Sequence, residues 1–180
     1  MPGAPRGQRR AREPGLVPAL GPADDGERGG QARPGDLLSL LPHTDPGFPD
    51  AYGSAWSGTD DAPLLAHFAE DGEYTDTGSS ITVRGHTGIA RFRRAMFAFS
   101  RDSRIVFTSL LADEGGFAAE WTWSGTATGD LVLDGRRYPA SDRPYSVIGV
   151  ALCRVDATGA ITAHRDYYDM RALLTQIDAL

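Results

Sequence analysis

The stretch of sequence that decides the fold is ITAHRDYY, at residues 161–168. Its side chains fall into two alternating sets, as they do on the two faces of a β-strand. One set contains His164, Asp166 and Tyr168, and the other contains Arg165 and Tyr167. We therefore expect a strand that carries an imidazole and a carboxyl group two residues apart on one face.

The sequence on either side of this strand predicts an α+β domain. Turn sequences such as Asp-Glu-Gly-Gly separate the further predicted strands, which cover residues 73–77, 104–112, 117–127, 131–138 and 145–155. Apolar residues at helical spacing predict helices at 49–58, 62–70, about 88–99 with Thr87 as its N-cap, and 170–177. Helices first and strands second are typical of a curved, mixed but mainly antiparallel sheet that wraps around N-terminal helices and leaves a cone-shaped pocket.

Length and composition limit the classes of protein to consider. The 180 residues, 41% of them hydrophobic, suffice for one domain, which we place at 46–180. Residues 1–45, rich in Pro, Gly and Arg, are predicted to form a disordered tail. A net charge of -6 argues against nucleic acid and anionic membranes as partners, and we expect neither a membrane span nor a signal peptide. The single cysteine, Cys153, favours the reducing cytoplasm.

The inward faces of the strands carry the candidate site. Trp121 and Trp123 share one face, so they would form an aromatic wall beside the face of His164 and Asp166. Such a wall keeps water away from a carboxyl group and so raises its pKa, as a general acid requires. The same residues also fit a structural role, with the tryptophans in the core and Asp166 paired at the surface.

Tyr74 and Asp76 extend the candidate site to a second strand. They lie two residues apart on the strand at 73–77 and would face the same cavity as an orienting pair. Asp76 is equally suited to capping the turn before Gly78.

The sequence gives no sign of a metal or a cofactor. His67 and His86 do not form a His-x-His or His-x-x-x-His pair, so we expect no metal site. There is no Gly-x-Gly-x-x-Gly, no phosphate-binding loop and no Gly-x-Ser-x-Gly motif. We therefore expect chemistry without a cofactor.

Several segments, in order, resemble the SnoaL-like polyketide cyclases of the nuclear-transport-factor-2-like superfamily. They are residues 68–71, 83–89, 98–102, 121–129 and 173–176, together with Asp169. The stretch 161–169 is similar to the last strand of the limonene epoxide hydrolases in the same superfamily. The resemblance covers about residues 50–180 and implies a cystatin-like α+β barrel and a homodimer.

The two families imply different catalytic residues. The hydrolase pattern implies Tyr74, Asp76 and Asp166, but its arginine and second carboxylate fall on Trp121 and Trp123, which can neither activate water nor protonate an epoxide. The cyclase pattern implies a single acid/base aspartate at Asp169. We prefer Asp166, because it shares a strand face with His164 and Tyr168, and keep Asp169 second.

The resulting hypothesis is a cyclase or isomerase of polyketide-like or terpenoid-like natural products that uses no cofactor. Asp166 would move a proton, and His164 or Tyr74 would polarise a carbonyl or epoxide oxygen. The substrate would be a small, mostly apolar, oxygenated molecule. The residues expected to contact it are Trp56, Trp121, Trp123 and Tyr168. The alternatives are an epoxide hydrolase that uses Asp76 and Asp166, and a binding protein without activity.

Overall fold

The computed structural model describes residues 40–180. Most of the predicted tail therefore lies outside the described residues. Within its last part, His43 is buried and its Nε2 lies 2.8 Å from the carbonyl oxygen of Asp113. None of the helices in residues 40–180 combines the length and the apolar character that a membrane span requires.

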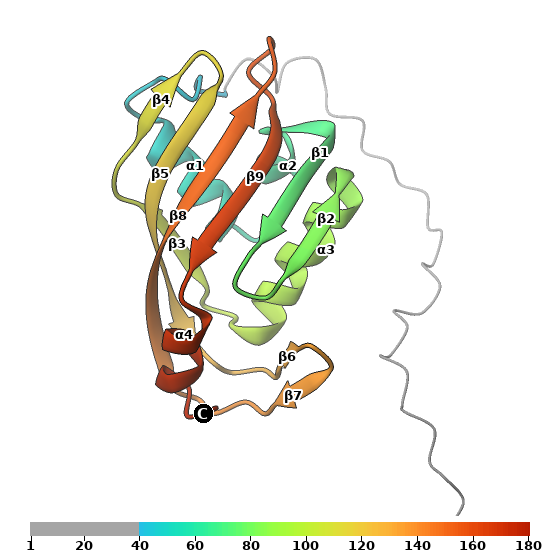
Figure 1. The fold of residues 1–180 in the computed structure, drawn as a ribbon, viewed down its shortest axis with the longest axis vertical. Coiled ribbons are helices and arrows are strands. Elements are labelled where there is room, and N and C mark those ends of the chain that lie inside the picture. Colours follow the sequence, from blue (N-terminus) through green and yellow to red (C-terminus); the bar gives the residue numbers. More distant parts are fainter. Residues whose placement is uncertain (1–39) are drawn as a thin grey trace, which may run out of the picture. The chain divides into compact units, whose positions relative to one another are not determined.

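Four helices and nine strands make up the described part of the chain (Figure 1). In chain order they are α1 (Phe48–Ser57), α2 (Ala62–Leu65), β1 (Phe68–Asp76), β2 (Ile81–Arg84), α3 (Gly85–Phe99), β3 (Arg104–Phe107), β4 (Leu111–Asp113), β5 (Gly116–Thr126), β6 (Leu131–Leu133), β7 (Arg136–Tyr138), β8 (Pro144–Val155), β9 (Ile161–Tyr168) and α4 (Met170–Gln176).

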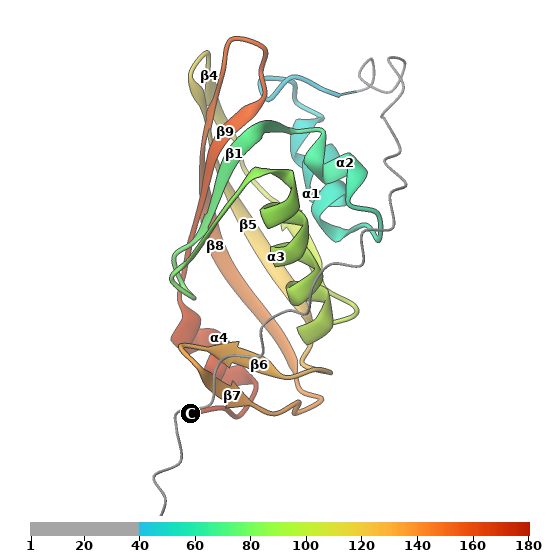
Figure 2. The same ribbon diagram turned by 90° about the vertical axis from the view of Figure 1, so that its right-hand side faces the viewer.

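Seven strands form one curved sheet in the order β2-β1-β9-β8-β5-β3, with β4 also paired to β5. All neighbours are antiparallel except β1 and β9, which run parallel. The sheet bends around α3, which lies across its concave side, while α1 packs on β3 (Figure 2). The hairpin of β6 and β7 and helix α4 lie at one end of the sheet (Figure 2). The predicted fold class is confirmed.

Helix α1 packs against the sheet through a row of aromatic residues. Pro49 stands in its first turn, where a missing N–H costs nothing. Phe48, Tyr52 and Trp56 recur at helical spacing and are at most 3% exposed. The ring of Tyr52 packs against the rings of Phe48, Trp56 and Phe107 of β3, so the concave side of the sheet has an aromatic core.

The structure corrects the predicted helix at 62–70. Helix α2 ends at Leu65, and Phe68 already lies in β1, where it pairs with Ile161 of β9. Backbone pairing between strands therefore outweighs the helical spacing of Leu64, Leu65 and Phe68. The predicted cap at Thr87 is also wrong. Helix α3 begins at Gly85, whose φ of 65° suits glycine at the abrupt change of direction from β2.

Two of the predicted strands are divided. The stretch at 104–112 forms β3 and β4. The segment that joins them, residues 108–110, has one residue more than the facing part of β5, residues 119–120. An extra residue of this kind bends the edge of a sheet. The stretch at 131–138 forms the β6–β7 hairpin, which turns at Asp134 and Gly135, both with positive φ.

A missing side chain on β8 makes room inside the sheet. Gly149 pairs with Trp121 on one side and Tyr168 on the other. A Cβ atom at Gly149 would lie 2.4 Å from Cζ2 of Trp121 and 2.7 Å from the carbonyl oxygen of Tyr167. The indole of Trp121 can therefore lie against the backbone of β8 only because residue 149 is glycine.

We expect Gly149→Ala to destabilise the fold by about 1–3 kcal/mol, because the new methyl group displaces the indole of Trp121. Thermal unfolding should show a midpoint lower by at least about 2 °C. The matched control is Gly115→Ala, where the nearest atom is an Asp113 oxygen 3.4 Å away. Equal melting points for the two variants would contradict this packing.

Candidate functional site

The candidate site is built on two neighbouring parallel strands. Tyr74 and Asp76 on β1 stand in register with His164 and Asp166 on β9. Alternation sends all four side chains to the concave side of the sheet, where each is at most 8% exposed. The structure therefore brings together the four residues that the sequence analysis selected from these two strands.

A cavity of about 280 Å³ lies in front of these strands. Most of its lining is apolar and comes from α3, β5, the β6–β7 hairpin and the start of α4. Its larger apolar residues are Ile81, Phe92, Met96, Phe99, Ile105, Leu131, Val132, Leu133, Met170 and Leu173. Trp121, Trp123, Tyr74, Asp76, Asp166 and Tyr168 also line it. A few acid and phenol groups in an apolar cavity are typical of a small-molecule site.

Three donors converge on the Asp166 carboxylate. Its Oδ1 accepts hydrogen bonds from Trp121 Nε1 at 2.8 Å and from His164 Nε2 at 2.9 Å. Its Oδ2 accepts one from the Tyr74 hydroxyl at 2.7 Å. These bonds offset the cost of burying the charge. A carboxylate has about four acceptor positions, so one position on Oδ2 has no partner among residues 40–180.

His164 lies behind Asp166 and does not line the cavity. It is 1% exposed, and its Nδ1 lies 2.8 Å from the hydroxyl of Tyr52. Burial is the largest single effect and lowers the pKa of His164, but Asp166 and, less strongly, Cys153 together outweigh it and raise the pKa to about 10. At neutral pH His164 is therefore an imidazolium that donates to Asp166 and to Tyr52. Its expected role in polarising a substrate oxygen does not fit this position.

Asp76 has a different environment from Asp166. Its Oδ1 accepts from the backbone N–H of Ser79 at 2.9 Å, and its Oδ2 accepts from the hydroxyl of Tyr168 at 3.1 Å. Burial and the nearby Asp166 carboxylate raise the pKa of Asp76, although the Ser79 N–H opposes the shift. Burial also raises the pKa of Tyr74 and of Tyr168, so both phenols stay protonated.

The remaining sequence-predicted residues lie in different places. Trp123 lines the cavity and donates to Ser103 Oγ at 2.6 Å. Trp56 lies behind the cavity, with its ring against those of Tyr74 and His164. Asp169 is exposed and caps α4, where its carboxylate accepts from two backbone N–H groups. It does not line the cavity.

The sequence analysis missed Tyr52 and the β6–β7 hairpin as parts of the site. Tyr52 lies on the predicted apolar stripe of α1, but only the folded chain shows that its hydroxyl reaches His164. Leu131, Val132 and Leu133 of β6 all line the cavity. This short apolar run directly before the Asp134-Gly135 turn is the signal that could have identified them.

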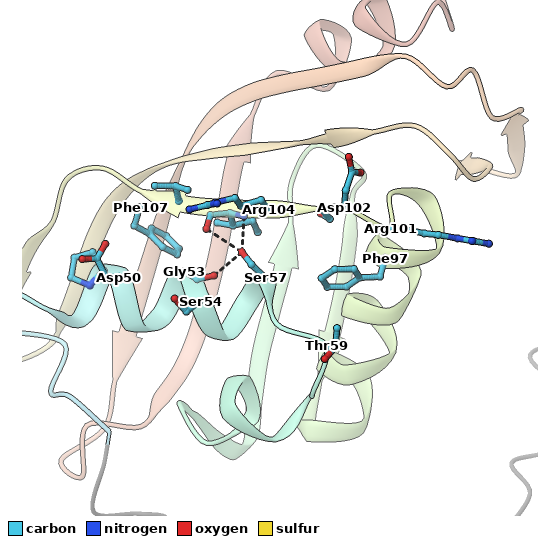
Figure 3. Close-up of a pocket in the computed structure, with 14 residues that line it drawn as sticks. Asp50, Gly53, Ser54, Ser57, Thr59, Phe97, Arg101, Asp102, Arg104 and Phe107 are labelled. Atoms are coloured by element: carbon cyan, nitrogen blue, oxygen red, sulfur yellow. Dashed lines mark hydrogen bonds between the residues drawn. The ribbon is translucent and has the colours of Figure 1, made fainter.

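A larger hollow of about 500 Å³ lies between α1 and β3 (Figure 3). Ser57 holds these two elements together there, because its Oγ lies 2.8 Å from the carbonyl oxygen of Gly53 and accepts from the N–H of Ile105 at 2.9 Å. None of the residues that the sequence analysis selected lines this hollow. We therefore assign the candidate site to the smaller, mostly apolar cavity.

We expect nuclear magnetic resonance of the ring nitrogens to show His164 doubly protonated at pH 7 and losing its proton near pH 10. In Asp166→Asn it should be neutral at pH 7, because burial remains and the carboxylate is gone. His67 is the internal control, because burial lowers its pKa to about 4. A neutral His164 in the wild-type protein would contradict the ion pair.

The raised pKa of His164 also makes the stability of the fold depend on pH. The folded-state pKa of His164 lies above its ordinary value of 6.5. The ion pair with Asp166 therefore stabilises the fold fully below pH 6.5, and this contribution is lost as the pH rises to about 10.

Comparison with known proteins supports the fold. No protein with a curated description matches the chain. A protein of Catenulispora acidiphila with a ketosteroid isomerase-like fold, crystallised with trimethylamine, is 24% identical, with a TM-score of 0.63 over 76% of this chain and 96% of its own. A candidate polyketide cyclase of Xanthomonas campestris pv. campestris is 26% identical, with a TM-score of 0.56 over 71% and 92%.

A candidate SnoaL-like polyketide cyclase of Jannaschia sp. CCS1 is 17% identical, with a TM-score of 0.61 over 72% of this chain and 87% of its own. Residues 50–164 match the family model for the SnoaL-like domain. Asp166 follows this match by two residues on the same strand. The fold and this match agree with the resemblance of the sequence, and the chain belongs to the SnoaL-like domain family.

Proposed function

We propose that the protein is a cyclase or isomerase that uses no cofactor and acts on a small, mostly apolar, oxygenated molecule. The observation that carries this proposal is the free acceptor position on Asp166 Oδ2, which belongs to a buried carboxylate that lines an apolar cavity. Several relatives in fold are described as candidate polyketide cyclases, which supports natural-product metabolism as the setting. The buried, free thiol of Cys153 supports a reducing compartment, for which we propose the cytoplasm.

The geometry supports proton transfer at carbon. Asp166 Oδ2 takes a proton from a carbon next to a carbonyl group, and the electron pair of that C–H bond forms an enolate. In a ring closure, the enolate carbon attacks a second carbonyl of the same molecule, whose π electron pair moves to its oxygen and takes the proton back from Asp166. In an isomerisation, the proton returns from Asp166 to another carbon. Acid–base assistance of this kind typically contributes about 10²–10⁴-fold to the rate.

The surrounding residues position Asp166 and the substrate. Tyr74, Trp121 and His164 fix both carboxylate oxygens, so the base is oriented before the substrate arrives. The indoles of Trp121 and Trp123 form one wall of the cavity and exclude water from the reacting atoms.

We expect Asp166→Asn to slow α-proton exchange of 1-tetralone in D₂O at least about tenfold, while the ketone still binds with nearly unchanged affinity. Proton nuclear magnetic resonance follows the exchange, and a binding titration gives the affinity. The control is Asp169→Asn, which alters an exposed helix cap outside the cavity and keeps a residue that caps well. Full activity in Asp166→Asn would contradict the assignment.

An epoxide hydrolase is the second candidate, because Asp76 and Asp166 both line the cavity. Hydrolysis of limonene oxide in ¹⁸O-labelled water incorporates the label into the product, whereas a ring closure does not. A protein that only binds its ligand would return both probes unchanged.

We also propose a homodimer that pairs the outer faces of the sheet. Ile148, Val150 and Leu152 alternate along β8 on this face and are 77%, 40% and 46% exposed, and Tyr167 on the neighbouring β9 is 46% exposed. An apolar patch of this extent is typical of a protein interface.

For the homodimer we expect light scattering to give twice the chain mass, and Ile148→Asp to give a monomer, since a charge in an apolar interface is costly. The control is Leu180→Asp, which alters an exposed leucine, 71% exposed, at the end of the chain. A wild-type protein that is monomeric at all concentrations would contradict the pairing.

A further inference from the structure

The cavity contains a second carboxyl group in register with the first. Asp76 and Asp166 are directly opposite each other on β1 and β9, and both line the cavity. Neighbouring strands lie about 4.8 Å apart, so one small molecule can touch both groups. A carbonyl oxygen and the carbon next to the carbonyl group are separated by only two bonds, so one ketone can present both atoms to the two carboxyl groups.

The two carboxyl groups differ in their partners. Asp166 accepts from an imidazolium as well as from Trp121 and Tyr74, and a cationic donor stabilises a carboxylate strongly. Within the part of the chain that the structure describes, the partners of Asp76 are the neutral N–H of Ser79 and the neutral hydroxyl of Tyr168. Two carboxylates side by side repel, so the one without a cation holds the proton.

We propose that Asp76 is a second catalytic residue, a general acid that protonates the substrate's oxygen while Asp166 takes a proton from carbon, and that the substrate is a ketone of about two fused rings. This inference rests on the proposed function. In the step, Asp166 Oδ2 gains the proton of the C–H bond, whose electron pair becomes a C=C bond. The carbonyl π pair moves to oxygen, which gains the proton of Asp76. An enol results, with no change in oxidation state.

The hydrogen bonds of Asp76 leave it able to donate. Its Oδ1 is turned to the Ser79 backbone and its Oδ2 to the Tyr168 hydroxyl, which donates to it. A protonated carboxyl group keeps acceptor capacity beside its own O–H. The acid therefore gives up its proton while Tyr168 stabilises the charge that forms. Gly78 leaves room for this phenol, since a Cβ atom there would lie 2.5 Å from Cζ of Tyr168.

The size of the cavity sets the size of the substrate. An apolar cavity of about 150 Å³ holds one benzene molecule. The cavity here measures about 280 Å³, nearly twice that volume. Two fused six-membered rings fill this volume, whereas part of a four-ring molecule extends out of it. Trp121 and the leucines of β6 offer flat and apolar surfaces for such rings.

Two bicyclic probes separate the acid from the base. Exchange of the α-protons of 1-tetralone needs a base and is assisted by an acid at the oxygen. Elimination from 5-nitrobenzisoxazole needs only a base, because its N–O bond breaks to release a phenolate that is stable without a proton. The proteins to compare are the wild type, Asp76→Asn, Asp166→Asn and the control Asp169→Asn, with thermal unfolding to verify folding.

We expect Asp76→Asn to lower tetralone exchange about 10–100-fold and to leave the elimination within about twofold of the wild type. Asp166→Asn should lower both reactions at least about tenfold. The four-ring ketone 4-androstene-3,17-dione should show no catalysed exchange.

Three results would overturn the inference. If Asp76→Asn exchanges tetralone protons as fast as the wild type, Asp76 is not the general acid. If Asp76→Asn loses both reactions equally, Asp76 has a structural role. If the wild type catalyses exchange of the four-ring ketone, the substrate is not limited to about two fused rings. The failure of the proposed function looks different, because the wild type then catalyses neither reaction or Asp166→Asn loses neither.

Discussion

The structure depends on the burial of one carboxylate. An ion placed in an apolar interior costs several kcal/mol unless hydrogen bonds and an opposite charge compensate it. Asp166 receives this compensation from three strands, through Tyr74 of β1, Trp121 of β5 and His164 of β9. Tyr52 extends the chain of contacts to helix α1. The curved sheet and its first helix are thus joined at the group that we propose does the chemistry.

The space in front of this carboxylate depends on small residues. Gly149 lets the indole of Trp121 lie on β8, and Gly78 lets the phenol of Tyr168 turn toward Asp76. The bulky side chains of Trp121 and Tyr168 can therefore lie where they do because residues 149 and 78 have no side chain. The two carboxyl groups have different surroundings, because Asp166 contacts the His164 imidazolium and the described partners of Asp76 are neutral. Such a difference allows one cavity to provide both a base and an acid.

Much of this could be predicted from strand alternation. The parity of residues 161–168 places His164, Asp166 and Tyr168 on one face, and β9 has the predicted bounds. Contacts between distant elements could not be predicted in this way. Alternation places His164 on the inward face but does not show that Tyr52 and Asp166 occupy both its ring nitrogens. The residues at 62–70 have a spacing that suits a helix, and only pairing with β9 makes Phe68 part of a strand.

The most direct test of the account is a crystal structure of the protein with 2-naphthol, a two-ring molecule with a single hydroxyl group. We predict that its rings lie against Trp121 inside the cavity, with the hydroxyl within hydrogen-bond distance of Asp166 Oδ2 or of Asp76. A cavity filled by protein side chains, or an Asp166 carboxylate turned to bulk water, would contradict it.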